Sequence, residues 1–474
     1  MKIRLGNGLA NMRDVALWCQ GELFDTLGGT ECDFEYVCTD SREADDKTLF
    51  VATRGERVDG HNYIASAIDK GCRCIICEYV PDALGDRRGM FVKVKDSVAA
   101  FALVAKGYRN GVSLDTVAVT GSVGKTTTKE LCASIIKGFR SLYYTEGNFN
   151  SVIGMPMSLM QIGPECDAAV LEMGMSGFGE IRSMTVTACP RIAMVTNVGS
   201  SHLEYLKTRE NIARAKLEIA EGLCDGGYLL LNGDEPLLRE IKPITSADIN
   251  TVYVSVERGT DCAVCARNIR VDERMTVFDL ECFGKTYKDL KINLAGRAFV
   301  YNAAFAATAA VLLGADESHI RQGLLSYVPS GMRQSISVKD GVTLIKDCYN
   351  AAPESMRSAI DTLMAQKTKG RRIAVLGDMR ELGADCEKMH AEVGRYAYEA
   401  GVDMIFTLGA LGALIARGAL DAGMSQDSLF CVESIDAFKE LADMIKSEMN
   451  TDDALLFKAS RSVGMERVAD VIFG

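Results

Sequence analysis

The sequence predicts an α/β protein of three domains arranged around a central, doubly wound parallel sheet. Three observations predict this fold class. The chain has 474 residues, which at roughly 150 residues per domain favours three domains. Short apolar runs alternate with helical periodicity from residue 117 onward. A second series of such runs begins near residue 328, after a stretch that reads as paired strands and one long helix.

The composition is that of an ordinary globular protein and excludes several classes of function. Hydrophobic residues make up 48% and charged residues 25% of the chain. The net charge of -11 and the pI near 5.1 argue against a nucleic-acid groove or an anionic membrane surface as the main partner. We find no apolar run of signal-peptide or membrane-spanning length, so we expect a cytoplasmic protein without membrane insertion.

Residues 1–112 are predicted to form a smaller N-terminal domain of mixed α/β structure. The stretch 63–72 predicts a helix that ends at Gly71, and the run CRCIICEYV directly after it predicts a buried strand. The polar, glycine-containing stretch 107–115 predicts a linker to the next domain.

Residues 113–327 are predicted to form the central domain, and residues 328–474 a Rossmann-like C-terminal α/β domain. Repeated strand–helix units imply a parallel sheet, and ligands bind at the carboxyl ends of such strands. A β-rich segment at about 251–294 precedes an alanine-rich helix. The predicted strands lie within the stretches 117–121, 141–145, 168–174, 192–199, 227–235, 371–379, 403–409, 428–432 and 453–460.

The turn TGSVGKTTT, between the first central strand and a helix, predicts a phosphate loop. Gly121 and Gly124 would let the backbone approach a phosphate, and the helix that begins near Lys125 would direct free N–H groups at it. Lys125 would neutralise the terminal phosphates, and the Thr126 hydroxyl would bind Mg²⁺. The usual spacing is G-x-x-x-x-G-K-[ST], whereas here it is G-x-x-G-K-T. An ordinary glycine-containing turn is the simpler alternative.

Two polar side chains follow other central strands at the same edge of the sheet. Glu172 ends the apolar run AAVL, and His202 follows VTNVGSS. The simpler interpretations are a carboxylate that caps the next helix and a structural histidine. Because both residues leave parallel strands beside the phosphate loop, the sequence favours a role in binding metal or phosphate.

Lys216 occupies an unusual position for a charged residue. On a helical wheel of residues 211–223 it falls near the middle of the apolar arc, whereas Arg214, Glu218 and Glu221 lie opposite. Burial penalises the ammonium form of lysine and therefore favours the neutral amine. The simpler alternatives are a side chain that extends to solvent, or an ion pair with a carboxylate such as Glu172.

Together these motifs resemble the Mur ligase family, the ATP-dependent amide-forming enzymes of peptidoglycan precursor synthesis. The family loop is of the T-G-x-x-G-K-T-T-T type, which residues 120–128 match. The segment 39–71 resembles the uridine-nucleotide domain of the family, and 146–156 resembles the loop that faces the muramoyl substrate. The segments 171–181 and 196–219 resemble those that carry the metal ligands and the lysine.

The C-terminal segments are similar to those of the family members that attach D-alanyl-D-alanine to UDP-N-acetylmuramoyl-tripeptide. These segments are DCYNAAPESM, VLGDMRELG and FKASRSVGMERV. The resemblance implies these two substrates as partners, ATP and Mg²⁺ as cofactors, and a monomer. It also implies that ATP phosphorylates the tripeptide carboxylate and that the dipeptide amine then displaces phosphate.

The resemblance also assigns roles to single residues. It places catalytic roles on Lys125, Lys216, His202 and Glu172, and it places Lys216 where the family carries a lysine carbamate. Metal ligands would be Thr126, Glu172, His202 and Lys216. Nucleotide-binding residues would be Gly121, Ser122, Gly124, Lys125, Thr126, Thr127, Asn302, Arg333 and Asp347. Substrate-binding residues would be Ser41, Arg42, Asn148, Asn150, Tyr349 and Asn350.

The sequence departs from the family pattern at a few positions. The family usually has G-x-H-N-x-x-N at the adenine, but Ala298 and Phe299 replace the His-Asn pair here, which predicts weak ATP binding. Lys346, Ala352 and Ser151 are further departures. Two alternatives remain open. One is another amide ligase of the family, such as a polyglutamate-adding enzyme, and the other is a non-catalytic paralogue that binds nucleotide and a partner.

Overall fold

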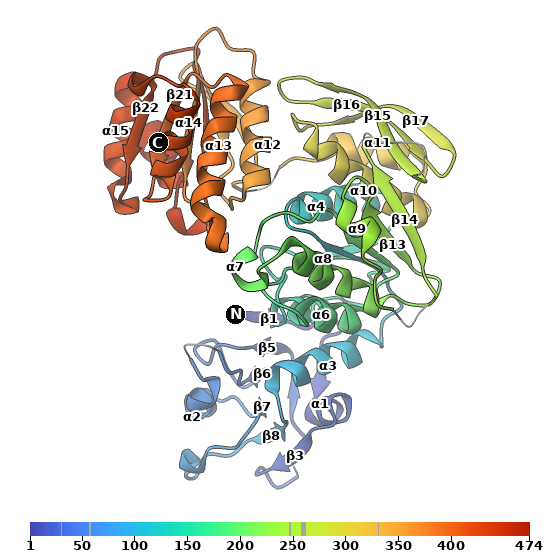
Figure 1. The fold of residues 1–474 in the computed structure, drawn as a ribbon. Coiled ribbons are helices and arrows are strands. Elements are labelled where there is room, and N and C mark those ends of the chain that lie inside the picture. Colours follow the sequence, from blue (N-terminus) through green and yellow to red (C-terminus); the bar gives the residue numbers. More distant parts are fainter. Residues whose placement is uncertain (30, 56–57, 246–247, 257–261, 330) are drawn as a thin grey trace.

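The computed structural model describes residues 1–474 except 30, 56–57, 246–247, 257–261 and 330. Parts of the segments 39–71 and 251–294 therefore lie outside the described residues. The chain forms three α/β units in succession, each around its own large sheet (Figure 1). The blue N-terminal unit and the red C-terminal unit flank the central unit. The predicted fold class is confirmed.

The first sheet has six strands, of which the middle four are parallel. The edge strands β1 and β3 run antiparallel to their neighbours. The run CRCIICEYV contains β7, and the helix predicted at 63–72 is α2 (Ile64–Asp69), preceded by a 3₁₀ turn. In spatial order the strands are β1 (Lys2–Arg4), β5 (Tyr36–Cys38), β6 (Thr48–Val51), β7 (Cys74–Cys77), β8 (Met90–Lys93) and β3 (Glu22–Asp25).

Helix α3 (Ser97–Arg109) corrects the predicted linker at 107–115. Asp96 caps this helix by accepting hydrogen bonds from the N–H groups of Val98 and Ala99. The helix continues through Arg109 because its apolar residues pack against α1 (Met12–Cys19) and also against helices of the central unit. The stretch between the two units is correspondingly shorter than its polar, glycine-containing sequence indicates.

The central sheet confirms the predicted parallel arrangement and extends it. Strands β9 to β15 are mutually parallel. The β-rich segment adds the antiparallel strands β16 and β17 to the same sheet. The spatial order is β10 (Leu142–Tyr144), β11 (Ala168–Glu172), β9 (Asp115–Thr120), β12 (Ile192–Val195), β13 (Tyr228–Asn232), β14 (Asn250–Ser255), β15 (Val264–Val271), β16 (Thr276–Cys282) and β17 (Lys285–Ile292).

Alternate residues of each central strand serve two different cores, as the pleat of a sheet requires. In β9, Ala118 packs under the helices of one face, whereas Val117 and Val119 pack under those of the other. Layers on both faces explain why the centres of these strands are continuously apolar. The first layer contains α5 (Gly154–Met160), α6 (Glu180–Ala188) and α8 (Arg209–Leu217), and the second contains α4 (Lys125–Ile136), α10 (Ala298–Leu312) and α11 (Glu317–Ser326).

The segment after α8 differs from the regular helix that its periodicity predicts. Helix α8 ends at Leu217, and a 3₁₀ helix follows over Glu218–Gly222. Glu218 is therefore buried, although the helical wheel places it opposite the apolar arc. Its carboxylate accepts hydrogen bonds from the N–H groups of Gly179 (2.8 Å) and Arg182 (3.1 Å) at the start of α6. The changed helical period accounts for the wrong prediction.

The C-terminal sheet confirms the predicted strands. The antiparallel β18 and β19 hairpin lies at one edge, and all other neighbours are parallel. In space the strands are β18 (Ser335–Lys339), β19 (Val342–Lys346), β23 (Ala454–Lys458), β20 (Arg372–Gly377), β21 (Met404–Leu408) and β22 (Leu429–Val432). The helices are α12 (Pro353–Met364), α13 (Cys386–Ala400), α14 (Gly412–Ala422), α15 (Phe438–Glu448) and α16 (Glu466–Phe473). Among the described residues, none of the helices has the length and apolarity needed to cross a membrane.

Candidate active site

The predicted phosphate loop lies between β9 and α4, where both of its glycines are required by close packing. A Cβ atom on Gly121 would lie 1.9 Å from Thr196 Oγ1. Gly124 has a φ of 83°, and a Cβ atom there would lie 2.6 Å from Asn302 Oδ1. The predicted adenine-side residue Asn302, on α10, therefore lies directly against the loop.

The loop is held in shape by the segment that follows β12. Asn197 Oδ1 accepts hydrogen bonds from the N–H groups of Ser122 and Val123, both at 2.9 Å. The N–H of Gly199 donates to Ser122 Oγ at 2.9 Å. Lys125 begins α4, and its Nζ donates to the carbonyl oxygen of Gly121 at 2.8 Å. Asn197 was not predicted as a site residue, although its position after the carboxyl end of a strand is a signal that could have indicated it.

Glu172 joins the phosphate loop to the predicted substrate loop. The Thr126 hydroxyl donates to Glu172 Oε2, and Asn150 Nδ2 donates to Glu172 Oε1, both at 2.8 Å. The simpler interpretation of Glu172 as a cap for the next helix is wrong, because Glu218 binds the N–H groups at the start of α6.

The paired oxygens of Thr126 and Glu172 fit Mg²⁺. Magnesium in nucleotide sites takes oxygen ligands, usually one or two from the protein and the rest from phosphate and water. Within the described part of the chain, no group of three or more His, Cys, Asp or Glu side chains is arranged to hold a metal. A Mg²⁺ ion at Thr126 and Glu172 would therefore need oxygens of a bound nucleotide to complete its shell.

The charge around Lys125 is mixed. Burial lowers the pKa of its ammonium group, and the charge of Arg333 lowers it further. The carboxylates of Glu172 and Glu381 oppose this effect. Lys125 thus lies within the field of two acidic residues and of a cation contributed by the C-terminal unit.

Lys216 is buried, as its sequence position predicts, with only 1% of its surface exposed. The side chain does not extend to solvent, and in the described structure it forms no ion pair with Glu172, so both simpler alternatives are wrong. Burial lowers its pKa well below the ordinary value for lysine, and the charge of Lys125 contributes to this shift.

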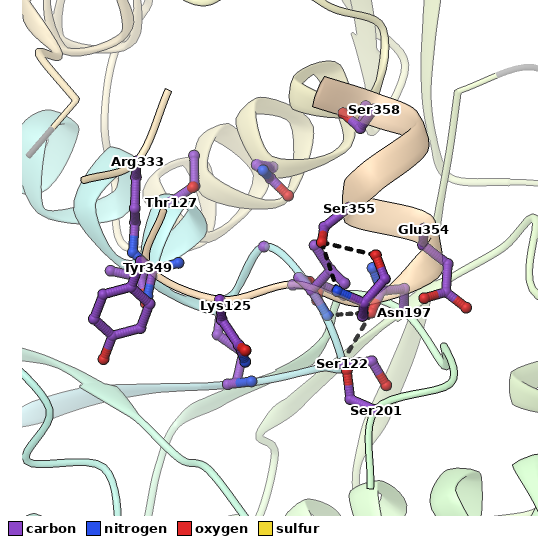
Figure 2. A pocket seen from close by; sticks show the side chains of 18 of the residues that line it. Ser122, Lys125, Thr127, Asn197, Ser201, Arg333, Tyr349, Glu354, Ser355 and Ser358 are labelled. Carbon is purple, nitrogen blue, oxygen red and sulfur yellow. Dashed lines mark hydrogen bonds between the residues drawn. The ribbon is translucent and has the colours of Figure 1, made fainter. Parts of the chain in front are cut away.

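A cavity of about 610 Å³ opens between the central and C-terminal units (Figure 2). In Figure 2, Lys125 lies between Arg333 and Tyr349 on one side and α12 on the other. Most of the predicted nucleotide, metal and dipeptide residues line this cavity. They are Ser122, Gly124, Lys125, Thr126, Thr127, Asn150, Glu172, His202, Asn302, Arg333, Asp347, Tyr349 and Asn350.

Five predicted residues do not line the cavity. Gly121 accepts a hydrogen bond from Lys125, and Lys216 is buried close enough to Lys125 for the two charges to interact. Asn148 is exposed in the loop that carries Asn150. Ser41 and Arg42 follow β5 in the N-terminal unit. There Arg42 pairs with Asp40 at 2.6 Å, and Lys70 Nζ donates to the carbonyl oxygens of Ser41 and Arg42.

The C-terminal wall of the cavity is organised by a buried ammonium group. Lys458 Nζ lies 2.7 Å from Asp347 Oδ2 and donates to the carbonyl oxygen of Asn350 at 2.9 Å. This pairing fixes the loop that carries Tyr349, whose ring lies 3.9 Å from the Arg333 guanidinium. Lys458 belongs to the segment FKASR but was not predicted as a site residue. Its position at the end of β23 was the available signal.

A second polar contact crosses between the two units. Glu354, on the first turn of α12, accepts hydrogen bonds at Oε1 from the N–H (3.0 Å) and the hydroxyl (2.9 Å) of Ser200. Gly199 allows this approach, because a Cβ atom there would lie 2.9 Å from the Glu354 carboxylate carbon. The adjacent residues Gly199 and Ser200 therefore link Ser122 of the phosphate loop to Glu354 of the C-terminal unit, each through its own hydrogen bonds.

Similarity to known proteins extends over nearly the whole chain. Three family models match it: "Mur ligase family, catalytic domain" at 33–108, "Mur ligase middle domain" at 119–310, and "Mur ligase, glutamate ligase domain" at 332–461. The UDP-N-acetylmuramoyl-tripeptide--D-alanyl-D-alanine ligase of Bacillus subtilis is 34% identical, and the match covers 91% of this chain and 92% of that protein.

Two solved structures have the same architecture. MurF from Acinetobacter baumannii has 27% sequence identity and a TM-score of 0.86, with 98% of this chain and 99% of that chain covered. A MurF ligase from Thermotoga maritima in complex with ADP has 29% identity and a TM-score of 0.80, with 92% and 96% covered. Sequence similarity and three-unit architecture agree along the chain's length, and the protein belongs to the Mur ligase family.

Proposed function

We propose that the protein is an ATP-dependent ligase that joins D-alanyl-D-alanine to UDP-N-acetylmuramoyl-tripeptide, releasing ADP and phosphate, in peptidoglycan precursor synthesis. The observation that carries the proposal is the cavity between two units. It combines a phosphate loop on one wall with the segment DCYNAAPESM on the other. Relatives that bear this activity in their names match more than nine-tenths of the chain.

The central wall of the cavity supplies the nucleotide site in this proposal. The phosphate loop and Lys125 hold the terminal phosphates of ATP, and Arg333 and Asp347 reach it from the opposite wall. Mg²⁺ held by Thr126 and Glu172 would add positive charge where the phosphoryl group is transferred. Glu172 and His202 would hold a second Mg²⁺ near the acyl oxygen, and a carbamate on Lys216 would help to position it.

In this proposal, the site accelerates the reaction mainly by positioning ATP and the two substrates for two successive steps. The terminal carboxylate of the tripeptide attacks the γ-phosphorus of ATP, giving an acyl phosphate and ADP. The amine of D-alanyl-D-alanine then attacks the acyl carbon, forming the amide bond as phosphate leaves and the amine loses a proton. The contact between Ser200 and Glu354 supports closure of the two units, which would protect the acyl phosphate from water.

The two organic substrates occupy opposite ends of the site in this proposal. Ser41 and Arg42 bind the uridine nucleotide, Asn148 and Asn150 contact the muramoyl part, and Tyr349 and Asn350 contact the dipeptide. The domain boundaries 1–112, 113–327 and 328–474, a monomeric state and a cytoplasmic location belong to the same proposal. A polyglutamate-adding activity is not favoured, because the named relatives at 30–34% identity use D-alanyl-D-alanine.

The decisive test is phosphate release that depends on both substrates. We expect ATP turnover only when UDP-N-acetylmuramoyl-tripeptide and D-alanyl-D-alanine are both present, with the corresponding pentapeptide product visible by mass spectrometry. A panel of other amines, including L-glutamate, serves as the control. Turnover with glutamate in place of the dipeptide would favour the polyglutamate alternative. Nucleotide binding without turnover under any combination would favour the non-catalytic alternative.

The departures at Ala298 and Phe299 lead to a prediction about ATP affinity. Both residues line the cavity beside Asn302, and neither offers a side-chain hydrogen bond to an adenine. The double substitution Ala298→His, Phe299→Asn is expected to lower KM for ATP by about tenfold, the effect of one or two regained hydrogen bonds. Phosphate release at varied ATP measures this. An unchanged or higher KM in a folded double variant would contradict this prediction.

A further inference from the structure

His202 is held by a carboxylate from the other side of the cavity. Its Nδ1 lies 2.7 Å from Oε2 of Glu381, which belongs to the turn after β20 in the C-terminal unit. This distance is that of a close polar contact, although its geometry does not meet the criteria for a hydrogen bond. In the described structure, Nδ1 of His202 has no hydrogen-bond partner, and the Glu381 carboxylate is the acidic group that lies against it. The contact therefore joins a cavity residue of the central unit to the C-terminal unit.

The backbones on both sides are shaped for this contact. His202 has a φ of 68° and Glu381 a φ of 64°, a conformation that costs free energy for residues other than glycine. The N–H of Glu204 donates to the carbonyl oxygen of Glu381 at 3.2 Å. Gly383 lets the turn approach, because a Cβ atom there would lie 3.2 Å from the backbone of Glu204. Two strained residues and one required glycine indicate a built contact between the units.

A carboxylate at Nδ1 has a defined effect on an imidazole ring. It stabilises the tautomer that carries its proton on Nδ1, which leaves the lone pair on Nε2 free to bind a cation or accept a proton. Carboxylates commonly hold metal-binding histidines in this way, and their loss typically weakens metal affinity or activity by 10- to 100-fold. His202 lines the cavity, so Nε2 is the ring nitrogen available to a ligand there.

We propose that Glu381 is a positioning residue that holds His202 in its Nδ1–H tautomer and so presents Nε2 to the cavity. Because Glu381 comes from the C-terminal unit, the ring is oriented only while that unit is docked on the central unit. Closure would therefore complete the site as well as cover it. The catalytic consequence of this assignment rests on the proposed function. The contact between His202 and Glu381 is independent of that function.

Nuclear magnetic resonance of ¹⁵N-labelled histidine tests the tautomer directly, without metal, nucleotide or substrate. The chain has only four histidines, so the His202 ring can be assigned by its loss in His202→Gln. At about pH 8, where histidine rings are mostly neutral, we expect the wild-type ring to carry its proton on Nδ1. Glu381→Met and Glu381→Gly should both move His202 toward the Nε2–H tautomer, and Glu381→Gln, which keeps an acceptor, should move it less.

Two variants separate the side-chain effect from other causes. Glu381→Gly relieves the positive φ while removing the carboxylate, so agreement with Glu381→Met excludes backbone strain as the cause. Glu387→Met, in an exposed residue of α13, is the matched control and should leave the His202 signals unchanged. A wild-type ring that already carries its proton on Nε2, or a His202 spectrum that Glu381→Met leaves unaltered, would overturn the proposal.

A kinetic measurement extends the test to the reaction. In the active enzyme, Glu381→Met is expected to raise the Mg²⁺ concentration needed for half-maximal turnover by 10- to 100-fold. KM for ATP should change little, because Glu381 does not line the nucleotide site. Failure of the proposed function would remove all turnover in the wild type but would leave the tautomer result standing. A Glu381→Met enzyme with wild-type Mg²⁺ dependence would overturn the catalytic part of the proposal.

Discussion

Replacing Lys125 with alanine is expected to abolish turnover, with kcat reduced on the order of a thousandfold or more, while the protein stays folded. Preorganised charges at a transferring phosphoryl group are the main catalytic resource of such sites, and losing one typically costs 10²- to 10³-fold. Lys125 begins α4 beside the loop and faces both Glu172 and Arg333. Its ammonium is therefore placed where phosphate charge would be neutralised.

Folding should survive this substitution because Lys125 contributes little to the core. In the described structure, its side chain donates a hydrogen bond to the carbonyl oxygen of Gly121 in the same loop and to no residue of the core. The buried face of α4 is formed by other residues, including Leu131 and Ile135. The matched control is Lys137→Ala, in an exposed lysine at the C-terminal end of the same helix. Circular dichroism, thermal unfolding and phosphate release should be measured on both. A folded Lys125→Ala enzyme with full activity would refute the phosphate-site assignment.

The fold could be predicted because its strongest determinants repeat locally. Strands β9, β11, β12 and β13 have apolar centres because helices cover both faces of the sheet, and their polar residues stand at the strand ends. The turn from β9 into α4 is specified within a few residues by Gly121 and Gly124. The prediction of secondary structure was wrong where the helix type changes and the residue composition does not. The change from α-helix to 3₁₀ helix at Glu218 is one example.

The sequence could predict site residues on the central wall of the cavity, because local motifs such as the phosphate loop specify them. Glu354 and Glu381 were not predicted as site residues, because each contacts a partner more than 150 residues away in the sequence. These partners are Ser200 and His202 respectively. A glutamate at the first turn of a helix, or in a turn after a strand, has an ordinary solvent-exposed alternative that sequence alone does not exclude. Contacts between units depend on how whole domains dock, which periodicity does not describe.

Lys216→Ala is expected to cause the second large loss of activity, because we propose that Lys216 carries a carbamate in the active enzyme. The side chain is only 1% exposed, and burial together with the charge of Lys125 lowers its pKa, which favours the neutral amine that reacts with CO₂. The amine attacks CO₂, forms an N–C bond and loses a proton, which leaves an anionic carbamate. That anion would remove the repulsion from Lys125 and supply oxygen ligands beside a metal.

Short carboxylates provide the sharpest test of this assignment. Alanine at 216 leaves a space where the lysine side chain was, and formate or acetate can place a carboxylate there in place of the carbamate. We expect Lys216→Ala to lose most of its turnover and to recover part of it as formate or acetate is added, with wild-type activity unaffected by the same salts. Arg214→Ala, in an exposed residue of the same helix, is the matched control and should need no rescue.

A direct observation separates the carbamate from a purely structural role for the lysine. Wild-type protein equilibrated with ¹³C-bicarbonate should show a carbamate carbon signal by nuclear magnetic resonance, and Lys216→Ala should lack it. A lysine that only fills its buried space would give no such signal, and its alanine variant would lose stability without responding to carboxylates. Undiminished activity in a folded Lys216→Ala protein would falsify the proposal outright. The predicted combination is a lost signal, lost turnover and partial rescue, because only an anion at this position accounts for all three.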